Sequence, residues 1–236
     1  MWAIQKNSYI MVKDNHQKKA EGISEVEVAL TKTEQFLEKH LNMVFYVIGG
    51  IVVVILGIIG ISKYVIAPRN TDAQEQMFAA QNYFSVDSFN VALNGDGVSL
   101  GFLDIIDQYG STKSGNLAHY YAGISFYHLG DYNQAIKQLK KFDSDDMLLV
   151  PLAKSAIGDC YVELSNFDKA ISAYESALSA NKNDFTTPTI KLKLALAYEA
   201  KGDVNKALSI LEEAKADYPN NAEVATIEKT IARLNQ

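Results

Sequence analysis

The sequence predicts an all-α protein, in which a single membrane-spanning helix near the N-terminus is followed by a solenoid of helix pairs. Two observations lead to this fold class. Residues 41–62 carry no charged side chain, and the last two thirds of the chain repeats a pattern of small and aromatic residues about every 35 positions. The composition is that of a folded chain, because 48% hydrophobic residues are too many for a disordered protein.

The apolar segment is long enough to cross a bilayer. Met43 to Ile61 reads MVFYVIGGIVVVILGIIGI, and as a helix these 19 residues would extend about 28 Å, close to the ~30 Å hydrocarbon core. We expect an uncleaved anchor, because 42 residues precede an apolar run longer than that of a signal peptide. Pro68 is predicted to end the helix, because proline disfavours helical conformation in the residue before it.

Four glycines fall within one 100° arc of the predicted span, counting about 100° per residue. Small residues let a second helix approach closely, so this arc is predicted to pack against another spanning helix. The alternative is that glycine is simply frequent in membrane helices. The predicted packing face consists of Gly49, Gly50, Gly57 and Gly60.

The charges around the span favour one orientation. The two 20-residue flanks carry two basic residues each, but Lys18 and Lys19 just outside the window favour a cytoplasmic N-terminus. Residues 70–236 hold 14 Lys and Arg against 22 Asp and Glu, a net charge of −8. An acidic domain is easier to place away from the anionic inner leaflet. We expect a short cytoplasmic tail and a domain outside the cytoplasm, and the reverse orientation stays open.

The tail, residues 1–40, is neutral overall, with six basic and six acidic residues. Its second half, residues 23–40, has the spacing of an amphipathic helix, and Ser24 with Glu27 forms a capping-box pattern at the start. The first ten residues fit neither the tail nor the anchor. Met11 is therefore an alternative to the first methionine as the true start.

The repeated segments align on three alanines, which are 35 and 37 positions apart. These are Ala135, Ala170 and Ala207. Each unit opens with a small residue, where two helices would cross closely, and an aromatic residue follows three positions later. The opening residues are Gly123, Gly158 and Ala195. A turn containing glycine or Ser-Asn separates the two predicted helices of each unit.

This pattern resembles the tetratricopeptide repeat, a helix–turn–helix unit of about 34 residues. The resemblance covers residues 72–234, after an anchor placed at 41–66. It comprises about three clear repeats and one degenerate leading repeat, whose helices are expected at 72–93 and 99–109. A capping helix over 221–234 would cover the last apolar face. The second unit departs from the pattern because it lacks the turn glycine.

The resemblance implies a concave groove lined by the first helix of each unit. Carried over position by position, the partner-binding residues in this groove are Tyr120, Ile124, Tyr127, His128, Asp159, Val162, Glu163, Leu192, Leu196 and Glu199. Such a mixture of aromatic, aliphatic and acidic side chains suits an extended or helical apolar segment of a partner. The alternative is that neighbouring repeats bury several of these positions.

No catalytic or cofactor motif stands out, and we expect no enzyme activity, metal or cofactor. No HExxH motif, cysteine pair or phosphate loop is present. Asp159 and Glu163 are four positions apart, and we interpret them as a solvated face rather than an acid pair. We expect residues 94–97 (NGDG) to form a turn, and we expect Cys160 to be a small buried thiol. The pI of about 5.3 argues against a nucleic-acid partner.

The layout of anchor, inner tail and outer repeat domain resembles bacterial ancillary subunits of the Sec translocon, of the YfgM type. That resemblance implies a non-enzymatic adaptor in the inner membrane of a Gram-negative bacterium, surrounded by the lipid bilayer and projecting into the periplasm. The implied partners are Sec translocon subunits, a membrane-anchored, isomerase-like periplasmic chaperone, and secreted client proteins. The alternatives are a scaffold of another envelope complex, in cell-wall synthesis or secretion, and a docking receptor facing the cytoplasm.

Overall fold

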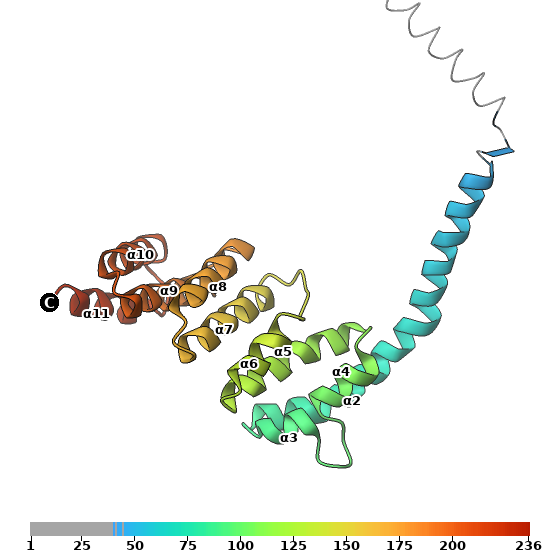
Figure 1. Ribbon diagram of the computed structural model, residues 1–236, viewed down its shortest axis with the longest axis horizontal. Helices are drawn as coiled ribbons and strands as arrows, with labels where there is room; N and C mark the ends of the chain where they lie inside the picture. The colour runs from blue at the N-terminus through green and yellow to red at the C-terminus, as the bar shows by residue number, and fades with distance from the viewer. Residues whose placement is uncertain (1–39, 41, 44) are drawn as a thin grey trace, which may run out of the picture. The chain divides into compact units, whose positions relative to one another are not determined.

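The computed structural model describes residues 40, 42–43 and 45–236. The chain divides into two units, Met1–Ser62 and Lys63–Gln236, and each is described by itself. Regular structure in the described part is helical throughout (Figure 1), which confirms the predicted all-α class. The amphipathic helix expected in the tail, apart from its last residue, and the two alternative start residues lie outside the described residues.

The apolar segment is helical, with residues 45–61 in α-helical conformation. Among the described residues, the helix Phe45–Ser85 is long and apolar enough to cross a membrane; its most apolar window has a mean hydropathy of 2.6, and none of that window is buried. Large side chains such as Val53 and Leu56 are exposed. A Cβ built at any of the four glycines of the predicted packing face would meet no atom within 4 Å. That face is therefore open to close approach.

Pro68 does not end the helix, and the prediction that it would was wrong. The helix that contains the apolar segment continues to Ser85. Residues Ser62–Ile66 form a π-helical turn, η1, and Pro68 lies in the first turn of the following helix, α2 (Ala67–Ser85). Proline lacks the N–H that would bond four residues back, and its ring clashes with that carbonyl. After the wider π-helical turn, Pro68 occupies a first-turn position, where no N–H is required.

The region expected to hold one helix over 72–93 contains two, so that prediction was wrong. Helix α2 ends at Ser85, and α3 (Phe89–Asn94) follows after a short break. In the break, Asp87 has a φ of 58°, and its N–H and that of the next residue bond back to carbonyls in the last turn of α2. This is the Schellman arrangement, in which aspartate tolerates the left-handed conformation better than most residues.

The loop between α3 and α4 (Phe102–Tyr109) is organised around Asp96, at the centre of the turn that the sequence predicts. Its Oδ1 accepts the backbone N–H groups of Ser99 at 2.6 Å and Val98 at 2.8 Å. Its Oδ2 accepts the hydroxyl of Tyr83 at 2.7 Å. The bond from Ser99, followed by those from Tyr83 and Val98, lowers the pKa of Asp96 to about 2.

Replacing Asp96 by asparagine is expected to remove part of the domain's sensitivity to acid. A carboxyl group whose pKa is lower in the folded state stabilises the fold above its unfolded pKa, and this contribution is lost as the pH falls through the folded pKa. For Asp96 this contribution to stability is lost between pH 3.8 and about pH 2, the pKa values of the unfolded and the folded state. Chemical denaturation at several pH values should show a steeper loss of stability in the wild-type chain than in Asp96→Asn. Equal slopes would contradict this role of Asp96.

Three helix pairs follow and pack in chain order, with a further helix, α11 (Val224–Leu234), after the last pair. The pairs are α5 (Lys113–His128) with α6 (Tyr132–Leu139), α7 (Leu149–Glu163) with α8 (Phe167–Ala180), and α9 (Thr187–Lys201) with α10 (Val204–Asp217). Each helix contacts the next, so the apolar face of one pair is covered by its neighbour. This is the packing of a helical solenoid.

A residue in the left-handed conformation ends the first helix of each pair. These residues are Gly130, Ser165 and Gly202, with φ of 80°, 55° and 93°. In every case its N–H and that of the next residue bond to carbonyls in the preceding turn. The next residue then caps the second helix with its side chain. Ser165 therefore takes the place of the turn glycine that the second unit lacks.

Small residues lie where the paired helices cross, as the sequence predicts. A Cβ built on Gly123 would lie 2.5 Å from Cγ of Leu139, and one built on Gly158 would lie 2.5 Å from Cε1 of Tyr174. Either contact would force the neighbouring side chain to move within a close-packed interior. The three alanines on which the units align are completely buried.

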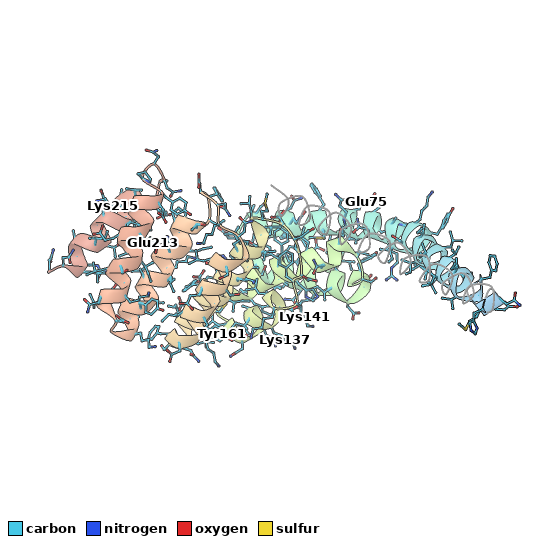
Figure 2. All side chains as sticks on the ribbon, turned by 90° about the horizontal axis from the view of Figure 1, so that it is seen from above. Glu75, Lys137, Lys141, Tyr161, Glu213 and Lys215 are labelled. Carbon is cyan, nitrogen blue, oxygen red and sulfur yellow. The ribbon has the colours of Figure 1, made fainter. Side chains whose placement is uncertain are left out.

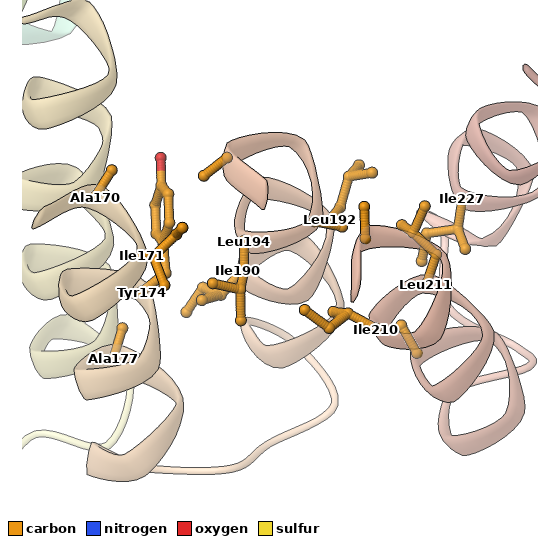
Figure 3. Close-up of a cluster of buried hydrophobic side chains, with 14 residues drawn as sticks. Ala170, Ile171, Tyr174, Ala177, Ile190, Leu192, Leu194, Ile210, Leu211 and Ile227 are labelled. Carbon is orange, nitrogen blue, oxygen red and sulfur yellow. The ribbon is translucent and has the colours of Figure 1, made fainter. Parts of the chain in front are cut away.

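A cluster of buried apolar side chains joins α8, α9, α10 and α11 (Figure 3). Tyr174 of α8, only 2% exposed, is the largest of the fully buried side chains in the described part of the chain. Ile227 of α11 is 0% exposed, so this helix covers the apolar face of the last pair, as a capping helix does. A second cluster of buried apolar side chains, around Phe102 and Ile105, is formed by helices α2, α3, α4 and α5.

Candidate partner-binding site

The residues expected to line a groove lie on α5, α7 and α9, the first helix of each pair. The structure places them in different environments. The exposed ones are His128, Glu163 and Leu196, and the half-buried ones are Tyr120, Ile124, Tyr127, Asp159, Val162 and Glu199. Leu192 is buried, with 8% of its surface exposed. The exposed side chains of His128, Glu163 and Leu196 can therefore contact a partner directly, whereas the half-buried and buried residues have little surface available for contact.

Residues at the ends of α5 and α7 come together. The ring of His128 stacks on Phe89 of α3, with ring centroids 4.3 Å apart and planes 4° from parallel. Burial raises the pKa of Tyr127, and the nearby carboxylates of Asp159 and Glu163 raise it further. The C-terminal ends of these two helices thus form one aromatic and acidic surface.

Asp159 links three helices, so its interpretation as part of a solvated face was wrong. Its Oδ1 accepts the hydroxyl of Tyr174 in α8 at 2.7 Å, and its Oδ2 accepts Nζ of Lys193 in α9 at 2.6 Å. Only 20% of the Asp159 side chain is exposed. Burial, reinforced by this carboxylate, raises the pKa of Tyr174, which keeps its hydroxyl protonated as a donor. Glu163 is exposed, as predicted, and accepts the hydroxyl of Tyr132 at 3.2 Å.

On α9, Glu199 forms a bidentate pair with Arg233 of α11, with N–O distances of 2.5 and 2.8 Å. The hydrogen bonds from Arg233 lower the pKa of Glu199. Glu199 and Arg233 are 34 positions apart, and so are Asp159 and Lys193. Opposite charges one repeat period apart are therefore the sequence signal that could have revealed both pairs. Leu196, 40% exposed, leaves an apolar contact point on this helix.

A pocket of about 610 Å³, which no sequence pattern predicts, lies on the opposite side of α7. It is enclosed by the end of α6, the loop that follows, α7 and α8. Its lining residues on α7 include Val150, Lys154, Ile157 and Tyr161, which lie within about 60° of one another on the helix and about 180° from Asp159. Helices of two repeat units enclose it, so no single segment of sequence carries its signature.

In the described part of the chain, no group of three or more His, Cys, Asp or Glu side chains is placed so that it could hold a metal ion.

Cys160 is 0% exposed, as the sequence predicts, and burial raises its pKa to about 12. Its thiol therefore stays protonated and unreactive near neutral pH. Nδ1 of His119 lies 2.8 Å from the side-chain oxygen of Gln138, and burial lowers the pKa of this histidine.

Two segments of the chain, residues 117–145 and 161–231, match family models described as the tetratricopeptide repeat. The chain is 36% identical over 70 residues to the BBSome complex member BBS4 of Bos taurus. It is 35% identical over 77 residues to the protein kinesin light chain-related 3 of Arabidopsis thaliana. Each match covers 30% of this chain, but only 13% and 12% of those proteins.

Among solved structures, the chain is similar to the TPR-like repeats of a kinesin light chain from Podosopora anserina. The TM-score is 0.57 at 13% identity, over 70% of this chain and 85% of that chain, a likeness that shows the fold alone. Tetratricopeptide-repeat proteins are generally non-catalytic scaffolds. Residues 117–145 and 161–231 of this chain therefore carry tetratricopeptide repeats, a scaffold of the kind that serves protein–protein interaction.

Proposed function

We propose that this chain is a membrane-anchored, non-enzymatic adaptor of the bacterial Sec translocon, which binds a periplasmic chaperone, emerging client proteins or both. The observation that supports this most is an apolar helix of spanning length on the same chain as a tetratricopeptide scaffold. Because none of its apolar window is buried, the helix needs lipid or another helix around it. A scaffold held at the membrane is well placed to meet proteins that cross there.

The anchor would hold the chain at the translocon through its glycine face. The four glycines leave open space at their Cβ positions, so the backbone of another spanning helix could approach closely. The charge distribution supports a cytoplasmic tail and a periplasmic repeat domain, because the net charge of −8 in residues 70–236 is repelled by the anionic inner leaflet. In this arrangement the chain is a single-pass protein of the inner membrane.

Chaperone or client would bind at the α5–α7–α9 surface, which consists of the aromatic and acidic surface of α5 and α7 together with the predicted groove residues of α9. His128, Glu163 and Leu196 are its exposed members, and Tyr127 lies among them half-buried. An apolar segment of a partner could cover Leu196 and the aromatic rings while a basic residue meets Glu163. The half-buried acids Asp159 and Glu199 position this surface through their bonds to other helices of the scaffold.

The experiment is purification of the full chain from bacterial membranes in mild detergent, followed by identification of the proteins that accompany it. We expect translocon subunits together with a membrane-anchored chaperone. The variant Gly57→Leu should lose the translocon subunits, because a leucine blocks close helix approach without a clash inside the chain. The variant Leu196→Glu should lose chaperone or client while it keeps the translocon.

Ser209→Glu serves as the control, because Ser209 is an exposed residue of α10, a helix that does not belong to the proposed surface. It should retain every partner of the wild-type chain. Recovery of cell-wall enzymes in place of translocon subunits would contradict the proposal and favour another envelope scaffold. Recovery of cytoplasmic proteins alone would favour a docking receptor on the inner side.

A further inference from the structure

The pocket between α6, α7 and α8 combines an apolar floor with a polar rim. Leu139, Ala153 and Ile157 contribute apolar surface, and Ser172 and Ser176 of α8 contribute hydroxyl groups. Its volume of about 610 Å³ falls within the range of roughly 300–1,000 Å³ that is typical of ligand sites. The pocket is therefore large enough for an apolar side chain with its neighbours on an extended peptide.

Three lysines from three different elements line the same pocket. Nζ of Lys140, just after α6, and Nζ of Lys169, in the first turn of α8, lie 5.9 and 5.5 Å from the ring centroid of Tyr161 in α7. Lys140 also approaches the Tyr161 hydroxyl at 3.4 Å. Lys154 of α7 donates to the hydroxyl of Ser176 at 3.1 Å. Two ammonium groups thus share one aromatic ring, and a third lysine lines the same pocket.

None of these three lysines has a carboxylate within 4.0 Å among the residues that the structure describes. The contrast with other lysines is clear, because Lys193 and Lys201 each hold an acidic partner at 2.6 Å. One carboxylate, that of Asp143, also lines the pocket, so the three lysines leave an excess of two positive charges there. Acidic residues outnumber basic ones in residues 70–236, so this local excess of cations runs against the charge of the domain. Such a cluster attracts an anionic group from outside the chain.

We propose that this pocket is a second partner-binding site, on the face opposite the α5–α7–α9 surface, and that it takes an acidic segment of a partner protein. A carboxylate of the segment pairs with Lys140 and Lys169 over the Tyr161 ring, and an adjacent apolar side chain enters between α6 and α8. The apolar floor and the hydroxyl groups along α8 favour a peptide over a bare anion. The chain would then hold two proteins at once, one on each face of the scaffold.

The test is fluorescence anisotropy on the full chain in detergent micelles, with a fluorescein-labelled hexapeptide of sequence DELDEF. The matched peptide NQLNQF replaces every carboxylate by an amide. We expect the acidic peptide to bind on the order of tenfold more tightly than the amide peptide, and its affinity to fall as salt is added. Equal binding of the two peptides would overturn the proposal.

The double variant Lys140→Gln/Lys169→Gln should weaken binding of the acidic peptide by on the order of tenfold, with unchanged thermal unfolding. The control is Lys137→Gln/Lys141→Gln, which removes the same charge from residues that do not line the pocket (both are labelled in Figure 2). It should keep binding within about twofold. An equal loss in both variants would contradict a specific site. Failure of the peptide to bind, together with binding of short-chain phosphatidylglycerol that depends on Lys140 and Lys169, would overturn it in favour of a lipid headgroup site.

Discussion

Replacing Asp159 by alanine is expected to lower the free energy of unfolding by about 3 kcal/mol, because it leaves two donors without an acceptor. The hydroxyl of Tyr174 is buried and has Asp159 as its acceptor at 2.7 Å. The side chain of Lys193 is 37% exposed, so water compensates part of the loss of its ion pair, and the expected cost lies below that of a fully buried pair. The measurement is urea denaturation of the full chain in detergent, followed by far-ultraviolet circular dichroism.

The matched control is Asp168→Ala. Asp168 also pairs with a lysine, Lys201, at 2.6 Å, but its side chain is 77% exposed. Its removal should leave the unfolding midpoint nearly unchanged, because exposed ion pairs contribute little. If both variants lose the same stability, then Asp159 does not act as a link between α7, α8 and α9. If Asp159→Ala keeps full stability but loses partner binding, Asp159 is a contact residue after all.

Gly158→Ala is expected to lower the free energy of unfolding by about 2 kcal/mol, although alanine is the better helix former by about 1 kcal/mol. The new Cβ would lie 2.5 Å from Cε1 of Tyr174, and this ring is 2% exposed and fixed by its bond to Asp159. The ring cannot move away without disturbing the close-packed cluster of α8 to α11. The same denaturation measurement gives the sign and the size of the change.

A double-mutant cycle separates this clash from a general intolerance of α7. Tyr174→Leu removes the ring, so the added cost of Gly158→Ala should be much smaller in that background. A cost that is equal in both backgrounds would show that the ring of Tyr174 is not the obstacle. A Gly158→Ala variant more stable than the wild-type chain would contradict the close crossing of α7 and α8.

The repeat architecture could be predicted because its determinants recur in the sequence. Ala135 and its two equivalents are buried where helices cross, and only small residues fit there. The turn of the second unit was recognisable from Ser165 and Asn166. Ser165 adopts the left-handed conformation and Asn166 caps the next helix, as glycine and aspartate do in the other two units. The residue types needed for close helix crossing and for the turn recur in the sequence of each unit, so the fold class could be predicted from them.

The errors arose where the conformation depends on more than a local pattern. Helix α2 ends and α3 begins around Asp87, although aspartate does not strongly disfavour a helix. Its left-handed conformation is set by the Schellman hydrogen bonds of the surrounding backbone. Pro68 was expected to stop a helix, and a preceding π-helical turn accommodates it instead. Asp159 was placed on a solvated face because its partners, in α8 and α9, belong to other parts of the sequence.

The most direct measurement is the side of the membrane on which Gln236 lies. Alkaline phosphatase fused after Gln236 becomes active only outside the cytoplasm, where its disulfides form, and green fluorescent protein at the same position fluoresces in the cytoplasm. The phosphatase fusion is expected to be active and the fluorescent fusion dark, because in the proposed orientation a single span with a cytoplasmic tail would carry the repeat domain across the membrane. An inactive phosphatase with a bright fluorescent fusion would place the repeats in the cytoplasm and contradict the translocon adaptor.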